Sequence, residues 1–157
     1  MPRPLAYLIT WTTYGTWLPG DERGWVERGI VGIQAGDVER EEQAQYVLTE
    51  EPVYLDLEQR RIVEQVIEEH CRYRGWTLRA VNARTNHVHV LITAEVAPER
   101  VMQELKSWAT RRLKANAQAR ELAERHRWWT PHGSTKWINN EGYLGNALRY
   151  VTEGQDS

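Results

Sequence analysis

Two histidines separated by one valine are the side chains in this sequence best placed to hold a metal ion. His87 and His89 lie in the segment NHVHVLI, whose length and β-branched content predict a buried strand. Side chains at positions i and i+2 leave a strand on the same face, so both imidazoles point the same way. One cation can then meet both rings, and imidazole suits Zn, Mn, Fe, Co and Ni better than Mg. The pair alone is equally typical of two solvated or hydrogen-bonded histidines on a half-exposed strand.

Two tyrosines near the end of the chain form a second group of interest. Tyr143 and Tyr150 share one side of a predicted C-terminal helix, whose buried side is formed by Leu144, Ala147, Leu148 and Val151. Tyr150 stands about 120° from Leu144 around an ideal helix, at the margin of that apolar stripe. A tyrosine there packs its ring and presents its hydroxyl at the surface of the sheet. On physical grounds the two tyrosines are equal candidates, and either suits an ordinary boundary position.

Hydrophobic periodicity predicts the elements that position these residues. We expect strands over residues 6–14, 76–83, 87–93 and 135–138, and helices over about 57–73, 98–125 and from a cap at Asn139 or Asn140 to Gly154. Residues 15–53 predict a long irregular connection, with one short acidic helix near residues 38–46. This order predicts an α+β fold, a ferredoxin-like sandwich in which helices cover one face of an antiparallel sheet.

Three further residues have simpler interpretations. His70 lies on the apolar stripe of the first helix and is expected to be a core or boundary residue, and His132 is expected in a loop because residues 128–134 interrupt the periodic pattern. Cys71 is the only cysteine, which excludes an intrachain disulfide and a thiolate zinc cluster. A reducing cytoplasm is the setting that this cysteine usage favours.

Composition predicts one globular domain, residues 1–157, with 41% hydrophobic and 27% charged residues. No segment approaches the roughly 18 apolar residues of a membrane span, so we expect neither secretion nor membrane insertion. The net charge of −2 argues against nucleic-acid binding, but the charges are unevenly distributed. Residues 37–69 hold eleven acids and three arginines, whereas residues 100–128 hold eight basic residues and three glutamates. This asymmetry is compatible with a basic surface, and equally with a solvated helix face.

The NHVHVL strand, the basic helix after it and the segment YVTEGQ, residues 150–155, together resemble the single-tyrosine HUH transposases. That family comprises small insertion-sequence transposases and REP-associated tyrosine transposases. The likeness extends over nearly the whole chain, from the first strand to Gln155. It implies a metal-dependent endonuclease and strand transferase that cuts single-stranded DNA near a hairpin through a 5'-phosphotyrosine intermediate.

The resemblance also implies a role for individual residues. His87 and His89 would hold a divalent cation, Mg or Mn, against the scissile phosphate, and Tyr150 would be the nucleophile. The family often takes a third ligand from a glutamine four positions after the tyrosine, where this chain has Gly154. Gln155 is about 140° from Tyr150 around an ideal helix, so it can serve only if the chain turns at Gly154; otherwise Glu153 is the substitute.

Two features leave alternatives open. REP-associated relatives place the tyrosine earlier, which keeps Tyr143 as a second candidate. Insertion-sequence members act as homodimers in which the histidines of one chain meet the tyrosine of the other, whereas some relatives act as monomers. A homodimer is the expectation for this chain.

DNA contact would involve the basic helix and exposed aromatic residues. The expected phosphate-binding residues are Lys106, Arg111, Arg112 and Lys114. Trp17, Trp25 and Trp128 are candidates for stacking on unpaired bases, and Trp108 is expected in the core because it lies on the apolar side of its helix.

Two other enzyme classes are excluded by the sequence. Histidine-triad hydrolases need a third alternating histidine, but position 91 is leucine, and two-histidine phosphoesterases need a second His-x-Ser/Thr motif, which does not occur. The remaining alternative is a domesticated DNA-binding relative that has lost cleavage, which the irregular spacing of Gln155 motivates.

Overall fold

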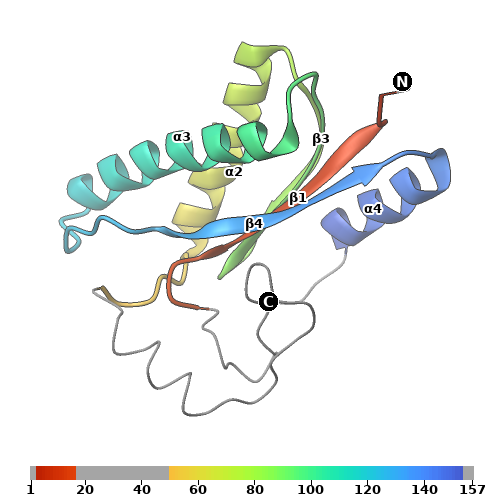
Figure 1. Ribbon diagram of the computed structural model, residues 1–157. Helices are drawn as coiled ribbons and strands as arrows, with labels where there is room; N and C mark the ends of the chain where they lie inside the picture. The colour runs from red at the N-terminus through yellow and green to blue at the C-terminus, as the bar shows by residue number, and fades with distance from the viewer. Residues whose placement is uncertain (1–2, 17–49, 154–157) are drawn as a thin grey trace, which may run out of the picture.

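Four strands form one antiparallel sheet in the order β2-β3-β1-β4 (Figure 1). The computed structural model describes residues 3–16 and 50–153. Its elements are β1 Ala6–Thr13, α2 Leu57–Arg74, β2 Thr77–Ala83, β3 His87–Thr93, α3 Pro98–Ala119, β4 Trp129–Ile138 and α4 Glu141–Glu153. This strand order confirms the predicted ferredoxin-like α+β fold. The expected acidic helix at residues 38–46 lies outside the described residues, as do Trp17, Trp25 and Gln155.

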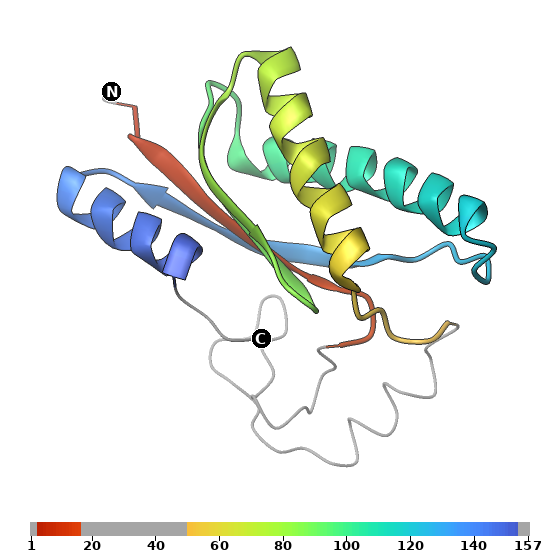
Figure 2. The same ribbon diagram turned by 180° about the vertical axis from the view of Figure 1, so that it is seen from behind.

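The two faces of the sheet bury different helices. The main core joins Ile9 and Trp11 of β1 and Val90 of β3 to residues of α2 and α3. A smaller cluster on the other face joins Leu91 of β3 to Val151 of α4. Figures 1 and 2 show α2 and α3 together on one side of the sheet and α4 on the other. The expectation that all helices cover one face therefore needs correction for α4, because Leu91 of β3 and Ala6 and Leu8 of β1 offer a second apolar surface to bury.

Local signals define α2 well. The Asp56 carboxylate accepts from the Gln59 backbone N–H, and the Gln59 side chain accepts from the Asp56 backbone N–H, which completes a capping box. Gly75 ends the helix in the left-handed conformation, with φ 74°. His70 is buried on this helix as predicted, and its Nε2 lies 2.8 Å from Glu104 Oε1.

Two other elements differ from their predicted limits. Helix α3 ends at Ala119 rather than near residue 125, and Glu121 follows with a φ of 58°. Strand β4 begins at Trp129 rather than at residue 135, so His132 belongs to a strand and not to a loop. Pro131 and Gly133 concealed this strand, but β4 is an edge strand paired with β1 alone, where proline is tolerated.

Glycine is required at position 133 for lack of space. A Cβ atom there would lie 2.6 Å from both Met102 Sδ and the Thr10 carbonyl oxygen. Within residues 3–16 and 50–153, no helix combines the length and apolar character needed to cross a membrane.

Candidate active site

The two histidines lie side by side on β3, an interior strand of the sheet. Their ring centroids are 4.7 Å apart and the ring planes are inclined by 72°. Val88, between them, is fully buried in the main core on the opposite face. The alternation of the strand therefore places both imidazoles on one face, as the sequence predicted, and this is the face that α4 covers.

His89 is held as a neutral ring with one nitrogen unsatisfied. Only 3% of its surface is exposed, and Thr10 Oγ1 lies 2.9 Å from Nδ1. Burial, which is the largest cause, and the charges of His87 and Arg84 together lower the pKa of His89 to about 4. Nε2 is buried and has no hydrogen-bond partner among the described residues. In the tautomer that donates Nδ1–H to Thr10, this Nε2 carries a lone pair available to a metal.

The neighbouring His87 is oriented in the same sense. Its Nδ1 lies 2.8 Å from Asn86 Oδ1. An amide oxygen only accepts, so Nδ1 of His87 is the donor, and in the neutral ring Nε2 carries the lone pair. A hydrogen bond to the far nitrogen is the usual outer support of a metal-binding histidine. The two rings therefore fit a divalent metal as part of its ligand set.

Tyr150, and not Tyr143, meets this pair. The ring centroids of Tyr150 and His89 are 5.0 Å apart, with planes inclined by 70°, and both residues belong to the same chain. The Tyr150 side chain is 39% exposed, so its ring packs while part of it stays accessible. Among the ring contacts of the described residues, none joins Tyr143 to either histidine, and Tyr143 is 62% exposed.

Helix α4 is fixed at both ends. Asn140 Oδ1 accepts from the Tyr143 backbone N–H at 2.9 Å, which makes Asn140 the N-cap. Near the other end, Asn82 Nδ2 donates to the Val151 carbonyl oxygen at 2.9 Å. Asn82 is the cross-strand partner of His89, so one residue beside the histidines also holds the tyrosine helix. Sequence analysis missed Asn82, because an asparagine in the middle of a predicted strand gives no sign of its partner.

One predicted core residue of α4 is exposed. Ala147 and Val151 are buried, but 41% of Leu148 is accessible, contrary to expectation. The helix lies over β2 and β3, and Leu148 lines a shallow hollow at the margin of that contact together with Leu144.

A third metal ligand is not found among the described residues. Within residues 3–16 and 50–153, no group of three His, Cys, Asp or Glu side chains is arranged to hold a metal. Glu153 is the exposed last residue of α4, and Gln155 lies outside the described part of the chain.

Lys106 does not belong to the predicted phosphate-binding surface. It is 6% exposed, and its Nζ donates to the carbonyl oxygens of Thr130, at 2.9 Å, and His132, at 3.3 Å. Burial lowers the pKa of Lys106 to about 8. Its ammonium therefore links α3 to β4 through these hydrogen bonds. Lys106 is not a candidate DNA contact.

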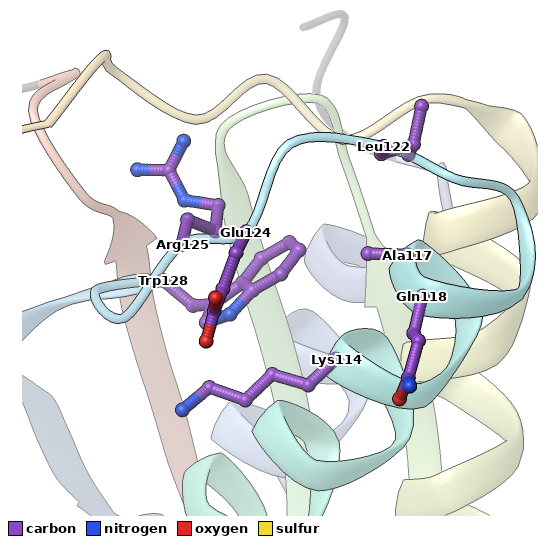
Figure 3. Close-up of a pocket in the computed structure, with 7 residues that line it drawn as sticks. All are labelled: Lys114, Ala117, Gln118, Leu122, Glu124, Arg125 and Trp128. Carbon is purple, nitrogen blue, oxygen red and sulfur yellow. The ribbon is translucent and has the colours of Figure 1, made fainter.

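The other three basic residues of the set are exposed. The Arg111 guanidinium lies 4.5 Å from the centre of the Trp108 ring, and Arg112 Nη2 is 3.5 Å from Glu69 Oε1. Lys114 lines a cavity of about 380 Å³ at the end of α3. Figure 3 shows Lys114 and Arg125 on two sides of this cavity, with Trp128 between them.

The two tryptophans near this surface differ from expectation in their exposure. Trp108 is 44% exposed, although its position on the helix predicted a core residue. Trp128 is 3% exposed and belongs to the main core, so it cannot serve as an open stacking surface. The apolar stripe of α3 is narrower than its sequence suggests, because Trp108 lies at its margin.

A ferredoxin-like sheet that carries a histidine pair on an interior strand, next to a tyrosine on the C-terminal helix, defines a protein of the single-tyrosine HUH class. Residues 46–153 match the family described as "Transposase IS200 like", and the chain belongs to this family.

A solved structure of a transposase has a similar fold. A REP-associated tyrosine transposase bound to a REP hairpin aligns with a TM-score of 0.50 at 12% sequence identity, over 96% of this chain and 66% of that one. This chain thus spans slightly less than two thirds of that transposase. A candidate transposase from Deinococcus radiodurans R1 aligns with a TM-score of 0.48 at 14% identity, over 100% of this chain and 95% of that one. No curated protein matches the sequence.

Proposed function

We propose that this protein is a divalent-metal-dependent endonuclease and strand transferase that cuts single-stranded DNA near a hairpin through a 5'-phosphotyrosine intermediate. The observation that carries the proposal is the contact between Tyr150 and His89, at 5.0 Å between ring centroids. This contact places the proposed nucleophile next to a candidate metal ligand. Membership of a transposase family supports a DNA-cleaving reaction.

The proposed reaction is an in-line displacement at phosphorus. Tyr150 Oη forms a bond to the phosphorus atom, and the bond from phosphorus to the 3' oxygen breaks. The phenolic proton goes to solvent, and the departing 3' oxygen gains a proton to become a free 3'-OH. The 5' phosphate stays on the tyrosine, and attack by another 3'-OH reverses the step and joins strands. No nucleotide cofactor is needed.

His87 and His89 are the proposed metal ligands of the described chain. When bound there, Mg or Mn would neutralise charge on the phosphate oxygens and help a phenol, whose ordinary pKa is about 10, to act as a nucleophile. The protein supplies the orientation of both rings through Thr10 and Asn86. Gln155 is the proposed third ligand, with Glu153 as its substitute.

Arg111, Arg112 and Lys114 are the proposed phosphate contacts of the DNA. All three are exposed on α3, and lysine and arginine supply most of the affinity of proteins for nucleic acids. A hairpin as target is supported by the REP-associated transposase, which was solved with a REP hairpin. A homodimer in the cytoplasm remains part of the proposal.

The proposal is tested with single-stranded oligonucleotides that tile both strands of the DNA flanking the gene. Each is incubated with the protein and Mn or Mg and then analysed on a denaturing gel. We expect a DNA-shifted protein band that needs the metal, survives Tyr143→Phe and disappears in Tyr150→Phe. Binding on native gels without any covalent band would contradict the proposal and favour the domesticated DNA-binding protein.

A further inference from the structure

We propose that Arg84 is a further catalytic residue of this site, whose guanidinium binds the phosphate that Tyr150 attacks. The inference rests on the proposed function and deepens it, because it names a positively charged side chain that binds the scissile phosphate. Neither the histidine pair nor the basic helix explains this arginine.

The position of Arg84 follows from the β2–β3 hairpin. Its backbone N–H donates to the His87 carbonyl oxygen at 2.7 Å, next to the last strand pair, Ala83 with Val88. Ala83 is buried in the main core, whereas Asn82 reaches α4 on the opposite face. Because side chains alternate along an extended chain, Arg84 follows Asn82 onto the face that holds His87.

The side chain of Arg84 lacks the partners that the nearby Arg60 and Arg79 have. It is half-buried, and its Nε is buried without a hydrogen-bond partner. Among the described residues, no carboxylate forms an ion pair with it, whereas Arg60 Nε donates to the Ala83 carbonyl oxygen and Arg79 Nε to Thr93 Oγ1. A buried charged donor without a partner is costly, so its retention beside a candidate active site indicates an anionic ligand.

A guanidinium suits the proposed role. Its donors match the geometry of phosphate oxygens, and its charge is fixed at all working pH values. Binding to the non-bridging oxygens would position the phosphorus for attack and stabilise charge that develops during the displacement. The histidines and Arg84 would then face the same phosphate.

The test compares Arg84→Gln with the matched control Arg79→Gln, an exposed arginine of β2. The first measurement is the rate of adduct formation at saturating oligonucleotide and Mn. We expect a loss of about 100-fold for Arg84→Gln, a smaller loss for Arg84→Lys and no change for the control. If the scissile phosphate is replaced by an uncharged methylphosphonate, the loss caused by Arg84→Gln should shrink to a few-fold or less.

A second measurement does not depend on cleavage. In a Tyr150→Phe background without metal, a single methylphosphonate is moved along the oligonucleotide and binding is measured at each position. We expect one position at which the methylphosphonate weakens binding to the protein that keeps Arg84. At the same position, it should not weaken binding to the protein with Arg84→Gln. The inference is overturned if Arg84→Gln forms adduct at the wild-type rate, or if this change slows adduct formation as much on the methylphosphonate as on the phosphate. It is also overturned if the binding measurement finds no such position. Failure of the wild-type protein to form any adduct would instead overturn the proposed function.

Discussion

At the scale of single residues, the site depends on neighbours that orient the histidines. Thr10 stands opposite His89 on the adjacent strand and bonds its Nδ1, while Asn86 bonds Nδ1 of His87. Both contacts engage Nδ1, so Nε2 is the nitrogen that each ring would offer to a metal. The sequence predicted the histidine pair from its spacing, but Thr10 lies 79 residues away and becomes a neighbour only through sheet pairing.

Replacement of Thr10 should weaken metal binding. In Thr10→Val the hydroxyl partner of Nδ1 is lost while the shape is kept, so we expect Mn to bind about 10- to 100-fold more weakly. Isothermal titration calorimetry measures this directly. Thr135→Val is the control, because Thr135 bonds Glu99 away from the histidines. Equal Mn affinity in Thr10→Val and wild type would show that Thr10 has no part in ligand orientation.

Lys106 should make stability depend on pH in the alkaline range. Its pKa is lowered from 10.5 to about 8 in the folded protein, so between these values the unfolded chain binds more protons. The free energy of unfolding should therefore rise with pH from about 8 to about 10.5, by at most about 3 kcal/mol, and be independent of this group below about 8.

Urea unfolding of wild type and Lys106→Met across this range isolates the effect. The quantity to compare is the difference in the free energy of unfolding between the two proteins. The raised pKa of Cys71 makes stability fall with rising pH, but it does so in both proteins and cancels in this difference. Parallel stability curves for the two proteins would contradict a lowered pKa at Lys106.

At the scale of elements, the tyrosine is placed by the docking of α4. Asn82 holds the Val151 carbonyl oxygen, and Val151 itself is buried against the sheet. We expect Asn82→Ala to raise hydrogen–deuterium exchange in the last turn of α4 and to slow adduct formation about 10-fold, because Tyr150 would lose its fixed position.

Asn146→Ala is the control for this change, since Asn146 is an exposed residue of the same helix, and its Oδ1 accepts a hydrogen bond from Arg149 Nη2. Mass spectrometry of the peptides from α4 reports the exchange. Unchanged exchange and unchanged rate in Asn82→Ala would show that the apolar contacts of α4 suffice to place Tyr150.

Elements with strong local signals were predicted well, and elements defined by distant contacts were not. The capping box at Asp56 and the glycine at position 75 fixed the ends of α2, and strand β3 has the predicted limits. The start of β4 was hidden because Pro131 and Gly133 are unusual in strands, and only pairing with β1 makes them strand residues. The face covered by α4 could not be predicted, because an amphipathic pattern shows which side of a helix is buried but not against what.

At the scale of the whole molecule, we predict that one chain supplies both the histidines and the tyrosine of a site. The sequence left open whether they meet within or between chains, and the rings of His89 and Tyr150 of one chain lie 5.0 Å apart between centroids. We expect that mixing a His87→Ala/His89→Ala double variant with Tyr150→Phe restores no adduct, because neither chain holds a complete site. Restoration of the covalent band in the mixture would show that the reacting groups come from two chains.

The central claim is that Tyr150 carries the DNA during the reaction. The most direct measurement is mass spectrometry of the covalent product after digestion of the DNA and the protein, which identifies the modified peptide. The account predicts a nucleotide attached through its 5' phosphate to Tyr150, formed only with Mn or Mg. A nucleotide on Tyr143, or free cleaved DNA without any protein adduct, would contradict it.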